Sequence, residues 1–582
     1  MQKQKIKQKN KQVMGFPGRK KLVLFFMLVA GVVLIGRAIQ LQVMDKQFLQ
    51  KQGRSRQVST VKISAYRGQI KDRNGESLAV SAPVESVWVN PQFCKEKEGK
   101  KLNKACAELT VQKIQQAAKL LNIPKAKVFK AFDISTNKQF VYLKRHIEPS
   151  LAAEVKILAL PGLGFIREFK RFYPTGEVSS HLLGFTNIDD KGQEGLELVY
   201  ESRLKGTAGS KRVLRDGKRR IIEDQDIESI KEPVAGQDVQ LSIDQRLQYL
   251  AYKTLKEGVI KHKAKSGSLV ILEAETGNIL AVANQPSFNP NMRKNLRISR
   301  YRNRAVTDVY EPGSTMKPLV VAAALEGGFI KDSQLFSTKK FRIKGRTVRD
   351  DHKYGILSLT GVLKKSSNVA ASRIALSMPA DYFWGFYHDL GFGVSPRVNF
   401  PGEASGFLPE YSGWSSFEQA TLSFGYRVSM STLQLARAYT VLADDGVLHS
   451  LSLLKRDKDE YATQIVSPKT AIKVRTMIEQ VVQKGGTATR ARVDGYRVAG
   501  KTGTVKKAVK GGYGKEHLSV FVGMAPASDP KLIIAVMVDA PQGDYYGGLV
   551  AAPIFSKVMG GSLRVLGVAP DEQKSMSVLL SK

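Results

Sequence analysis

The sequence predicts an α+β protein of several domains. It has a single N-terminal transmembrane helix, a β-rich pedestal domain, and a larger domain with a central antiparallel sheet flanked by helices. Three observations support this prediction. The chain of 582 residues exceeds the ~100–200 residues of one typical domain. An apolar run lies close to the N-terminus, and the larger domain has strand-like runs at both ends of a helix-rich middle.

A basic segment precedes the apolar run. Residues 1–21 carry eight Lys or Arg residues and no acid, whereas residues 22–43 contain one charge, Arg37. The run is close to the ~20 residues that span a bilayer, and Arg37 near its end can extend its charge to the interface. We therefore expect a cytoplasmic tail (1–21), an uncleaved transmembrane anchor (22–43), and the rest of the chain outside the cytoplasm.

Composition narrows the class of function. Lys and Arg outnumber Asp and Glu by 91 to 52, but this excess of +39 is spread along the chain without one dominant basic block. We expect no nucleic acid partner, and an anionic polymer or membrane surface as the counter-charge. The seven histidines lack metal-ligand spacing, so no metal and no other cofactor is expected. Cys94 and Cys106 are expected to be two unpaired thiols, although export would permit them to pair.

Residues 44–232 form the predicted pedestal domain, with short β-like runs and Lys-rich helical segments. Arg67–Ala79 predicts a hairpin, because an Asn-Gly turn separates two strand-like runs. Two polar, turn-rich segments follow at Arg171–Pro174 and Gly192–Glu197. Interlocking salt bridges explain their charges better than a binding site does. We expect no catalytic residue in this region.

A segment rich in Pro and Gly at 232–238 marks the start of the larger domain, placed at 233–566, with a polar tail at 567–582. The predicted elements are an extended run at 239–244, a helix at 245–261, a hairpin of 268–273 with 278–283, a helix-rich middle to about residue 485, and strands at 498–505, 519–524 and 532–538. Because strands at both ends enclose the helices, we expect one antiparallel sheet built from both ends of the domain.

The segment Tyr310–Pro318, with the sequence YEPGSTMKP, predicts a turn that leads into a helix. Pro312 and Gly313 supply the turn, so Ser314 lies near a helix N-terminus. Free N–H groups and the positive end of the helix dipole favour an anionic oxygen there. Lys317 follows three residues later on the same helix face, so its amine can reach the Ser314 hydroxyl.

Two motifs further along the chain distinguish this pair from chance. They are Ser366-Ser367-Asn368 and Lys501-Thr502-Gly503-Thr504. The bare Ser-x-x-Lys pattern recurs, for example at Ser337 and Lys340, and is weak alone. Only Ser314 combines a preceding Pro-Gly turn with both later motifs, and this order predicts an active site.

The residue types suit a serine nucleophile whose base is a lysine. Lys317 can take the Ser314 proton only when it is neutral, and burial beside a second cation, Lys501, lowers a lysine pKa. Ser366 can relay the proton to a leaving amine. Asn368 is suited to hydrogen-bond the substrate amide.

The third motif predicts where the substrate lies. The glycines of this strand-like run leave room for a peptide that approaches as an added strand. Thr502, Gly503 and Thr504 are expected to bind this peptide, with the two hydroxyls near a terminal carboxylate. The backbone N–H groups of Ser314 and Thr504 would form the oxyanion hole.

With its three motifs in this order, the chain resembles the class B penicillin-binding proteins, the serine D,D-transpeptidases of bacterial cell-wall synthesis. The resemblance covers nearly the whole chain, including the pedestal segments described above, and no segment resembles a glycosyltransferase domain. Four segments are most similar to the cell-division branch of the family: Ser423–Tyr426, Ser431–Ala436, Gly523–Pro530 and Tyr545–Gly548. Arg427 stands where the family pattern has glycine, and Ala370 where glycine is frequent; both bear on loop shape and on the fit of β-lactams.

The resemblance implies a pedestal of the penicillin-binding protein dimerisation type and a penicillin-binding transpeptidase domain. Ser314 would be acylated by a peptidoglycan stem peptide ending in D-Ala-D-Ala, release D-alanine, and pass the acyl group to an amine of a neighbouring strand. β-Lactams would acylate the same serine. The implied location is the bacterial inner membrane at the division septum, with the N-terminus in the cytoplasm and the bulk in the periplasm. The implied partners are the septal glycan polymerase and other divisome membrane proteins.

Other functions share part of this pattern. β-Lactamases, D,D-carboxypeptidases and penicillin-sensing receptors use the same three motifs, although residues 1–21 are too few for a signalling module. Two further alternatives are an elongation-type class B transpeptidase and a non-catalytic division scaffold.

Overall fold

The computed structural model describes residues 17–94, 106, 111–214, 229–293 and 297–572. The chain divides into two compact units, residues 1–64 with 208–233, and residues 65–207 with 234–582. Residues 1–16 of the predicted cytoplasmic tail and 573–582 of the predicted C-terminal tail lie outside the described residues.

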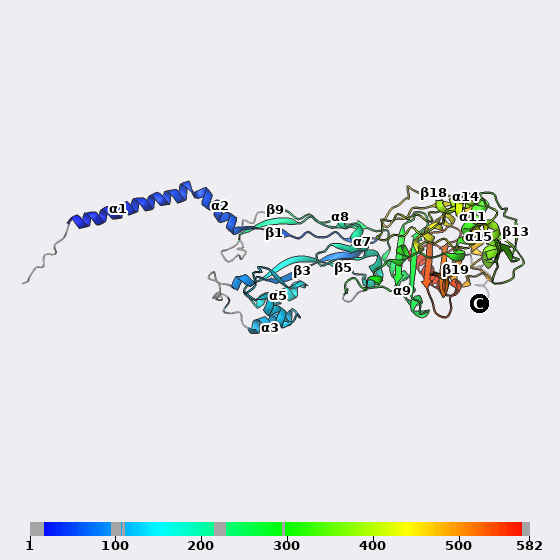
Figure 1. The fold of residues 1–582 in the computed structure, drawn as a ribbon, viewed down its shortest axis with the longest axis horizontal. Coiled ribbons are helices and arrows are strands. Elements are labelled where there is room, and N and C mark those ends of the chain that lie inside the picture. Colours follow the sequence, from blue (N-terminus) through cyan, green and yellow to red (C-terminus); the bar gives the residue numbers. More distant parts are fainter. Residues whose placement is uncertain (1–16, 95–105, 107–110, 215–228, 294–296, 573–582) are drawn as a thin grey trace, which may run out of the picture. The chain divides into compact units, whose positions relative to one another are not determined.

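The first unit begins with the predicted transmembrane segment (Figure 1). It is helical as expected: α1 (Pro17–Ile39) continues into a π-helical turn, η1 (Gln40–Met44), and α2 (Lys46–Gln57) follows. Within it, Gly18–Met44 is long and apolar enough to cross a bilayer, and none of its most apolar stretch is buried. The same unit contains a three-stranded sheet in the order β1 (Val58–Ile63), β8 (Gly209–Leu214), β9 (Ser229–Lys231).

The pedestal part of the second unit contains a five-stranded sheet. Its elements are β2 (Ile70–Lys71), β3 (Ser77–Val89), β4 (Val141–Ile147), β5 (Leu163–Phe172), β10 (Val239–Gln240) and the helices α3 (Val111–Leu120), α4 (Lys125–Ala131) and α5 (Pro149–Ile157). The long strand β3 pairs with β2, β4 and β5, and Figure 1 shows β3 and β5 side by side. Apolar side chains of β3, β4 and the three helices form one buried cluster. The predicted hairpin is confirmed as β2 and β3, which pair antiparallel.

The Asn-Gly turn of this hairpin has a simple local cause. The Asp72 carboxylate accepts hydrogen bonds from the backbone N–H groups of Asn74, at 2.8 Å, and Glu76, at 2.9 Å. Gly75 has φ +90°, which a residue without a Cβ adopts at little cost. Beyond the pedestal, only Val239–Gln240 of the extended run predicted at 239–244 is a strand, and it pairs parallel to β2.

A disulfide joins Cys94 and Cys106, so the expectation of two unpaired thiols was wrong. Both side chains are buried and their Cα atoms are 5.6 Å apart, which is within the reach of a disulfide. Cys94 ends the short 3-10 helix η2 (Pro91–Cys94). A disulfide in this domain agrees with an exported location.

The polar segments of the pedestal form a buried salt-bridge network, as predicted. The Glu197 carboxylate accepts from Arg67 Nε at 2.8 Å and from Arg171 Nε at 2.6 Å, and all three side chains are buried. Arg67 also pairs with Glu201 at 2.7 Å. Short elements hold these groups: η4 (Gly176–Ser179), α6 (Ser180–Leu183), β6 (Phe185–Thr186), β7 (Gly192–Glu194), α7 (Gly195–Val199) and α8 (Glu201–Leu204).

Replacing Glu197 by glutamine is expected to destabilise the protein by about 3–5 kcal/mol, because it leaves two buried guanidinium groups without their shared counter-charge. The denaturant midpoint of the full chain in detergent, measured by pulse proteolysis, checks this. Glu154→Gln is the control, because Glu154 is exposed on α5. Equal midpoints for the two variants would show that the network contributes little to stability.

The larger domain is built on the predicted antiparallel sheet, in the order β12-β11-β21-β20-β19. Its strands are β11 (Ser266–Glu273), β12 (Ile279–Gln285), β19 (Ala499–Val509), β20 (Gly512–Ala525) and β21 (Leu532–Asp539). The first two strands and the last three therefore share one sheet, as expected. The predicted helix at 245–261 is confirmed as α9 (Gln245–Lys261), which packs with α19 (Gly547–Val565) on the sheet.

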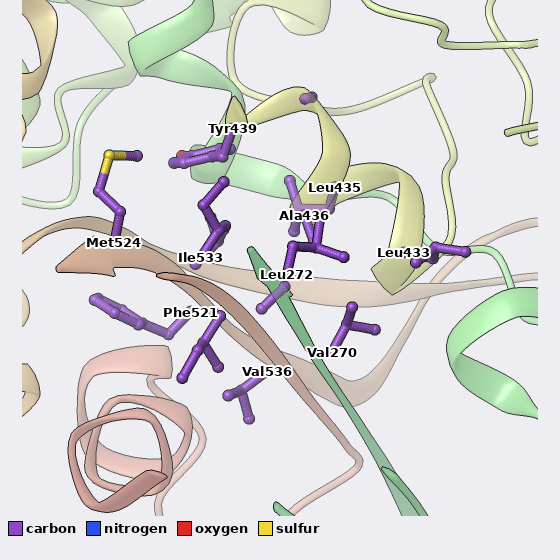
Figure 2. Packing of buried hydrophobic residues seen from close by; sticks show 14 of the residues in the cluster. Val270, Leu272, Leu433, Leu435, Ala436, Tyr439, Phe521, Met524, Ile533 and Val536 are labelled. Atoms are coloured by element: carbon purple, nitrogen blue, oxygen red, sulfur yellow. The ribbon is translucent and has the colours of Figure 1, made fainter. Parts of the chain in front are cut away.

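Helices cover both faces of this sheet. Figure 2 shows α16 (Thr432–Ala438) over one face, with Leu433, Leu435 and Ala436 against strand residues such as Leu272 and Ile533. On the other face, the Phe521 ring lies 4.6 Å from that of Phe555 in α19. Successive residues of these strands are apolar and buried, and successive residues of a strand point to opposite faces. Both faces of the sheet are therefore apolar and covered.

The helix-rich middle forms the remainder of the domain. Its helices are α10 (Arg304–Thr307), α11 (Lys317–Glu326), α12 (Leu359–Lys365), α13 (Asn368–Ala375), α14 (Ala380–Asp389), α15 (Ser416–Leu422), α17 (Thr440–Ala443) and α18 (Pro468–Glu479), with 3-10 turns η5 (Ile298–Arg300), η6 (Gly313–Met316), η7 (Tyr411–Gly413) and η8 (Thr489–Ala491). Short strand pairs interrupt them: β13 (Leu335–Ser337) with β16 (Ile356–Ser358), β14 (Phe341–Ile343) with β15 (Arg346–Val348), and β17 (Val447–Leu448) with β18 (Thr463–Gln464). Among these elements, η6 contacts β19 of the sheet, and α11 packs against α13 and α18.

Candidate active site

Ser314 lies on η6, the 3-10 turn that leads directly into α11. Gly313 before it has φ +61°, a conformation that favours glycine. A Cβ at Gly313 would also lie 2.3 Å from Cγ2 of Val505, so the turn and β19 approach each other closely. Ser314 is half-buried, and Lys317, the first residue of α11, is fully buried. The sequence prediction of a turn feeding a helix is confirmed.

Lys317 connects the first motif to the second. Its Nζ donates to the backbone oxygen of Ser366 at 2.5 Å and to Oδ1 of Asn368 at 2.7 Å, and it lies 3.1 Å from Oγ of Ser366. A neutral amine has two N–H donors, which these two carbonyl oxygens accept, and one lone pair. The arrangement therefore suits an amine that can take a hydroxyl proton.

The second motif is held by Asp350, which the sequence prediction missed. Its carboxylate accepts from the Ser367 hydroxyl at 2.6 Å and from the backbone N–H groups of Asn368, at 2.5 Å, and Val369, at 3.0 Å. Ser367 also caps α13, and Ser366, with φ +59°, ends α12 in the left-handed conformation. Asp350 follows the β14/β15 hairpin and belongs to no motif, so only the fold shows its role.

Lys501 of β19 joins the same cluster from the sheet. Its Nζ donates to Oγ of Ser366 at 3.0 Å, and to the backbone oxygen of Thr502 at 3.2 Å. Both lysines therefore contact one serine hydroxyl, although they are far apart in the sequence. The structure brings together Lys317, Ser366, Asn368 and Lys501 as predicted.

The Ser314 hydroxyl itself has no hydrogen bond to any of these groups within the described part of the chain. The amine of Lys317 is turned toward Ser366 and Asn368. The predicted hydrogen bond between Ser314 and Lys317 is therefore absent from the described residues. The two residues lie one helical turn apart, and the Ser314 hydroxyl is left without a partner on the turn that leads into α11.

β19 is an edge strand of the sheet, which leaves one side open for pairing. The hydroxyl of Thr502 lies 3.0 Å from that of Thr487, and that of Thr504 accepts from the backbone N–H of Gly547. A Cβ at Gly503 would lie 2.8 Å from the Pro312 oxygen. Glycine is therefore required here because the strand packs closely against the turn that carries Ser314. The sequence prediction explained this glycine by the approach of a substrate instead.

Burial governs the charge of the two lysines. It lowers the pKa of Lys317 to about 7, against the opposing effect of Asp350 and Asp351. Burial, and then the neighbouring Lys317, lower the pKa of Lys501 well below its ordinary value. The sequence prediction gave the cation Lys501 a part in lowering the pKa of Lys317. In the structure burial lowers the pKa of Lys317, and the effect of one lysine on the other appears at Lys501, whose pKa Lys317 lowers. One proton can thus be held or released by this pair near neutral pH.

The two departures from the family pattern have different structural consequences. Arg427 has φ +68°, so this non-glycine residue keeps the left-handed conformation that favours glycine. Its N–H donates to Glu311 at 2.7 Å and its guanidinium pairs with Glu418 at 2.8 Å, which hold it there. Ala370 is fully buried within α13, where it causes no strain.

Comparison with known proteins identifies the family of the chain. Residues 267–560 match the family described as the penicillin-binding protein transpeptidase domain, and 62–241 match the penicillin-binding protein dimerisation domain. A probable peptidoglycan D,D-transpeptidase PenA of Neisseria gonorrhoeae is 42% identical over 96% of this chain and 95% of its own length. The peptidoglycan D,D-transpeptidase FtsI of Escherichia coli K12 is 39% identical over 94% of this chain and 91% of its own.

A solved structure is similar as well. The apo TP domain of Burkholderia pseudomallei penicillin-binding protein 3 covers 57% of this chain and 98% of its own, with 41% identity and a TM-score of 0.53. The chain therefore belongs to the penicillin-binding proteins. Within that family it is a class B peptidoglycan D,D-transpeptidase, a class of enzymes that act on peptidoglycan and bind β-lactams, and its apolar N-terminal helix suggests a membrane anchor.

Proposed function

We propose that this transpeptidase works through an acyl-enzyme on Ser314 and acts at the division septum. The observation that carries the mechanism is the buried cluster in which Lys317 and Lys501 share the Ser366 hydroxyl, beside Ser314 and the open edge of β19. Relatives named FtsI support the division role. The septal glycan polymerase and other divisome membrane proteins are the partners that this role requires.

In the first half-reaction, neutral Lys317 takes the Ser314 proton while Oγ attacks the carbonyl carbon between the two terminal D-alanines. The backbone N–H groups of Ser314 and Thr504 stabilise the oxyanion, each donor typically contributing about 3 kcal/mol. The C–N bond then breaks, and the proton passes through Ser366 to the amine of the departing D-alanine. Lys501 keeps this relay oriented.

In the second half-reaction, an amine of a neighbouring strand loses a proton through the same relay and attacks the ester carbon. The new amide forms and Ser314 regains its proton. Asn368 hydrogen-bonds the donor amide, and Thr502, Gly503 and Thr504 bind the peptide along β19. An edge strand supplies unpaired backbone groups for such an added strand.

The mechanism is tested by incubating the full chain in detergent with a donor peptide ending in D-Ala-D-Ala and a primary amine. We expect release of D-alanine and formation of the amide in equal amounts, both stopped by benzylpenicillin. Release of D-alanine with no amide at any amine concentration would indicate a carboxypeptidase. No release, with normal binding of the peptide, would indicate a scaffold.

A further inference from the structure

A pocket of about 490 Å³ lies in the larger domain, and the charged part of its wall contains three arginines and no acid among the described residues. The arginines are Arg397, Arg437 and Arg456. The rest of the wall is apolar or carries hydroxyl groups, as at Leu451 and Tyr461. Cations on one wall repel each other, so an anion that contacts them would be stabilised.

The pocket lies at the edge of the sheet opposite to β19. Part of its wall comes from residues 450–456, which lie against the start of β12. The Ile279 N–H donates to the Ser452 oxygen at 2.9 Å. Arg456 donates to the Thr276 oxygen at 2.6 Å. β12 and β19 are the two edge strands of the five-stranded sheet, and the four strand spacings between them amount to about 19 Å. The pocket is therefore distinct from the candidate active site.

Arg456 is held by the protein itself. Its guanidinium donates to the backbone oxygens of Thr276, at 2.6 Å, and Ser450, at 2.5 Å. It also pairs with Asp459 at 3.1 Å. The Asp459 carboxylate lies 3.2 Å from Nδ1 of His449 and accepts from the Ser450 N–H at 2.7 Å. These contacts fix the loop and use the charge of Asp459 within it.

The other two arginines have no acid of their own. Arg437, in the last turn of α16, donates through Nε to the His449 oxygen at 2.9 Å. Its two terminal nitrogens form no hydrogen bond within the described part of the chain, and both are accessible to solvent. Gly391 leaves room for this guanidinium, because a Cβ there would lie 2.5 Å from one of its nitrogens. The Arg397 side chain is exposed and forms no hydrogen bond or ion pair with the described residues.

The two unpaired arginines act on each other. Burial has the largest effect on the pKa of Arg437 and lowers it; Asp459 opposes this effect, and Arg397 lowers the pKa further. Arg397 is therefore a neighbouring cation of Arg437, and both line the same pocket. An oxyanion between them would offset their repulsion and accept their free N–H groups.

Other charges of this region do not cancel these two arginines. Four acids of neighbouring segments have contacts of their own: Asp389 with His388, Glu403 with the Val398 N–H, Asp444 with His449, and Asp445 with Arg475. Four exposed charges of the loop beside the pocket sum to zero: Lys455, Asp457, Lys458 and Glu460. The positive excess of the pocket is therefore carried by Arg397 and Arg437.

We propose that Arg397 and Arg437 bind an oxyanion, a carboxylate or phosphate group of a small organic ligand, at a site separate from the acylation site. Guanidinium groups bind both kinds of oxyanion through paired N–H donors. The volume of about 490 Å³ is within the ~300–1,000 Å³ of small-molecule sites. The apolar wall and Tyr461 would contact the body of the ligand. This proposal does not depend on the acyl-enzyme.

Modification of arginines by phenylglyoxal tests the proposal on the full chain in detergent. Peptide mapping by mass spectrometry gives the modification rate of each arginine. The rates are measured with inorganic phosphate, with glutarate, and with sodium chloride at equal ionic strength as the reference. The rates at Arg397 and Arg437 are divided by the rate at Arg342, which is exposed on β14 and outside the pocket wall, so that general effects cancel.

We expect phosphate or glutarate to protect Arg397 and Arg437 together, in a saturable way. At twice the Kd, the relative rate at both should fall about threefold, because the occupied site excludes the reagent. Stronger protection by phosphate would identify a phosphate-bearing ligand, and stronger protection by glutarate would identify a carboxylate-bearing one.

A variant tests whether the two arginines share one ligand. In Arg437→Gln, the anion concentration that half-protects Arg397 should rise about tenfold, because a charge-assisted contact is lost. The control is Arg490→Gln, since Arg490 is exposed on η8 outside the pocket wall. It should leave that concentration unchanged.

Three results would overturn the proposal. The first is no protection of Arg397 in the wild type by either anion. The second is equal protection of Arg342, which would show a general effect of the added charge. The third is an unchanged half-protecting concentration in Arg437→Gln. Because the wild-type rates are measured without any substitution, the proposal stays testable even if this variant folds poorly.

Discussion

Replacing Ser314 by alanine is expected to lower acylation by benzylpenicillin by at least about 10⁴-fold, because it removes the hydroxyl that forms the ester. The fold should persist, since Ser314 is half-buried and its hydroxyl makes no hydrogen bond within the described residues. In cells depleted of the native protein, the variant should reach the membrane and fail to restore septation. Fluorescent penicillin labelling and cell length are the measurements.

The control for this prediction is Ser337→Ala. Ser337 begins another Ser-x-x-Lys pattern, but it is exposed on the short strand β13. This variant should label and divide normally. Normal division with Ser314→Ala, at normal expression and without labelling, would show that the protein supports septation as a scaffold.

Replacing Lys317 by methionine is expected to lower the acylation rate constant by about 10²–10⁴-fold, the usual contribution of a general base. Methionine has a similar length and suits a buried position, so the variant removes the amine and keeps the volume. Stopped-flow acylation by benzylpenicillin measures the loss. Lys340→Met, an exposed lysine of the same domain, should act as wild type.

The pH dependence of the acylation rate constant tests whether Lys317 is the base. Because burial lowers the pKa of Lys317 to about 7, its neutral form accumulates as pH rises through that value. The wild-type rate constant should therefore increase with pH between about 6 and 8 and then level off. The apparent pKa belongs to the Lys317–Lys501 pair. A rise near the ordinary lysine pKa, or an equal rise in Lys317→Met, would contradict the role of Lys317.

Much of the fold could be predicted because the patterns are local. The helix Gln245–Lys261 follows from its periodicity, and the hairpin at Asn74-Gly75 from its turn residues. The pairing of β11 with β21 joins strands more than 250 residues apart in the chain. From the sequence we could predict that these strands share one antiparallel sheet, because strands at both ends of a domain favour one sheet. The sequence did not predict which strands are neighbours.

Other features depend on tertiary contacts that leave no sequence signal. Asp350 looks like an ordinary loop acid, yet it holds three groups of the second motif. Cys94 and Cys106 lie in a polar segment that suggested separate thiols, and their burial brings them together. The three site motifs were found from sequence because they follow one another in a fixed order and a Pro-Gly turn precedes the first, although the Ser-x-x-Lys pattern alone recurs in the chain. The hydrogen bonds that join them required the fold.

The central claim is that a hydroxyl at position 314 receives the acyl group while a buried amine next to it takes the proton. It is tested most directly by digesting the benzylpenicillin adduct of the full chain and mapping the modified peptide. We predict one adduct, equal in mass to intact benzylpenicillin, on Ser314 in the peptide that contains Tyr310–Lys317. An adduct on any other residue would contradict the account.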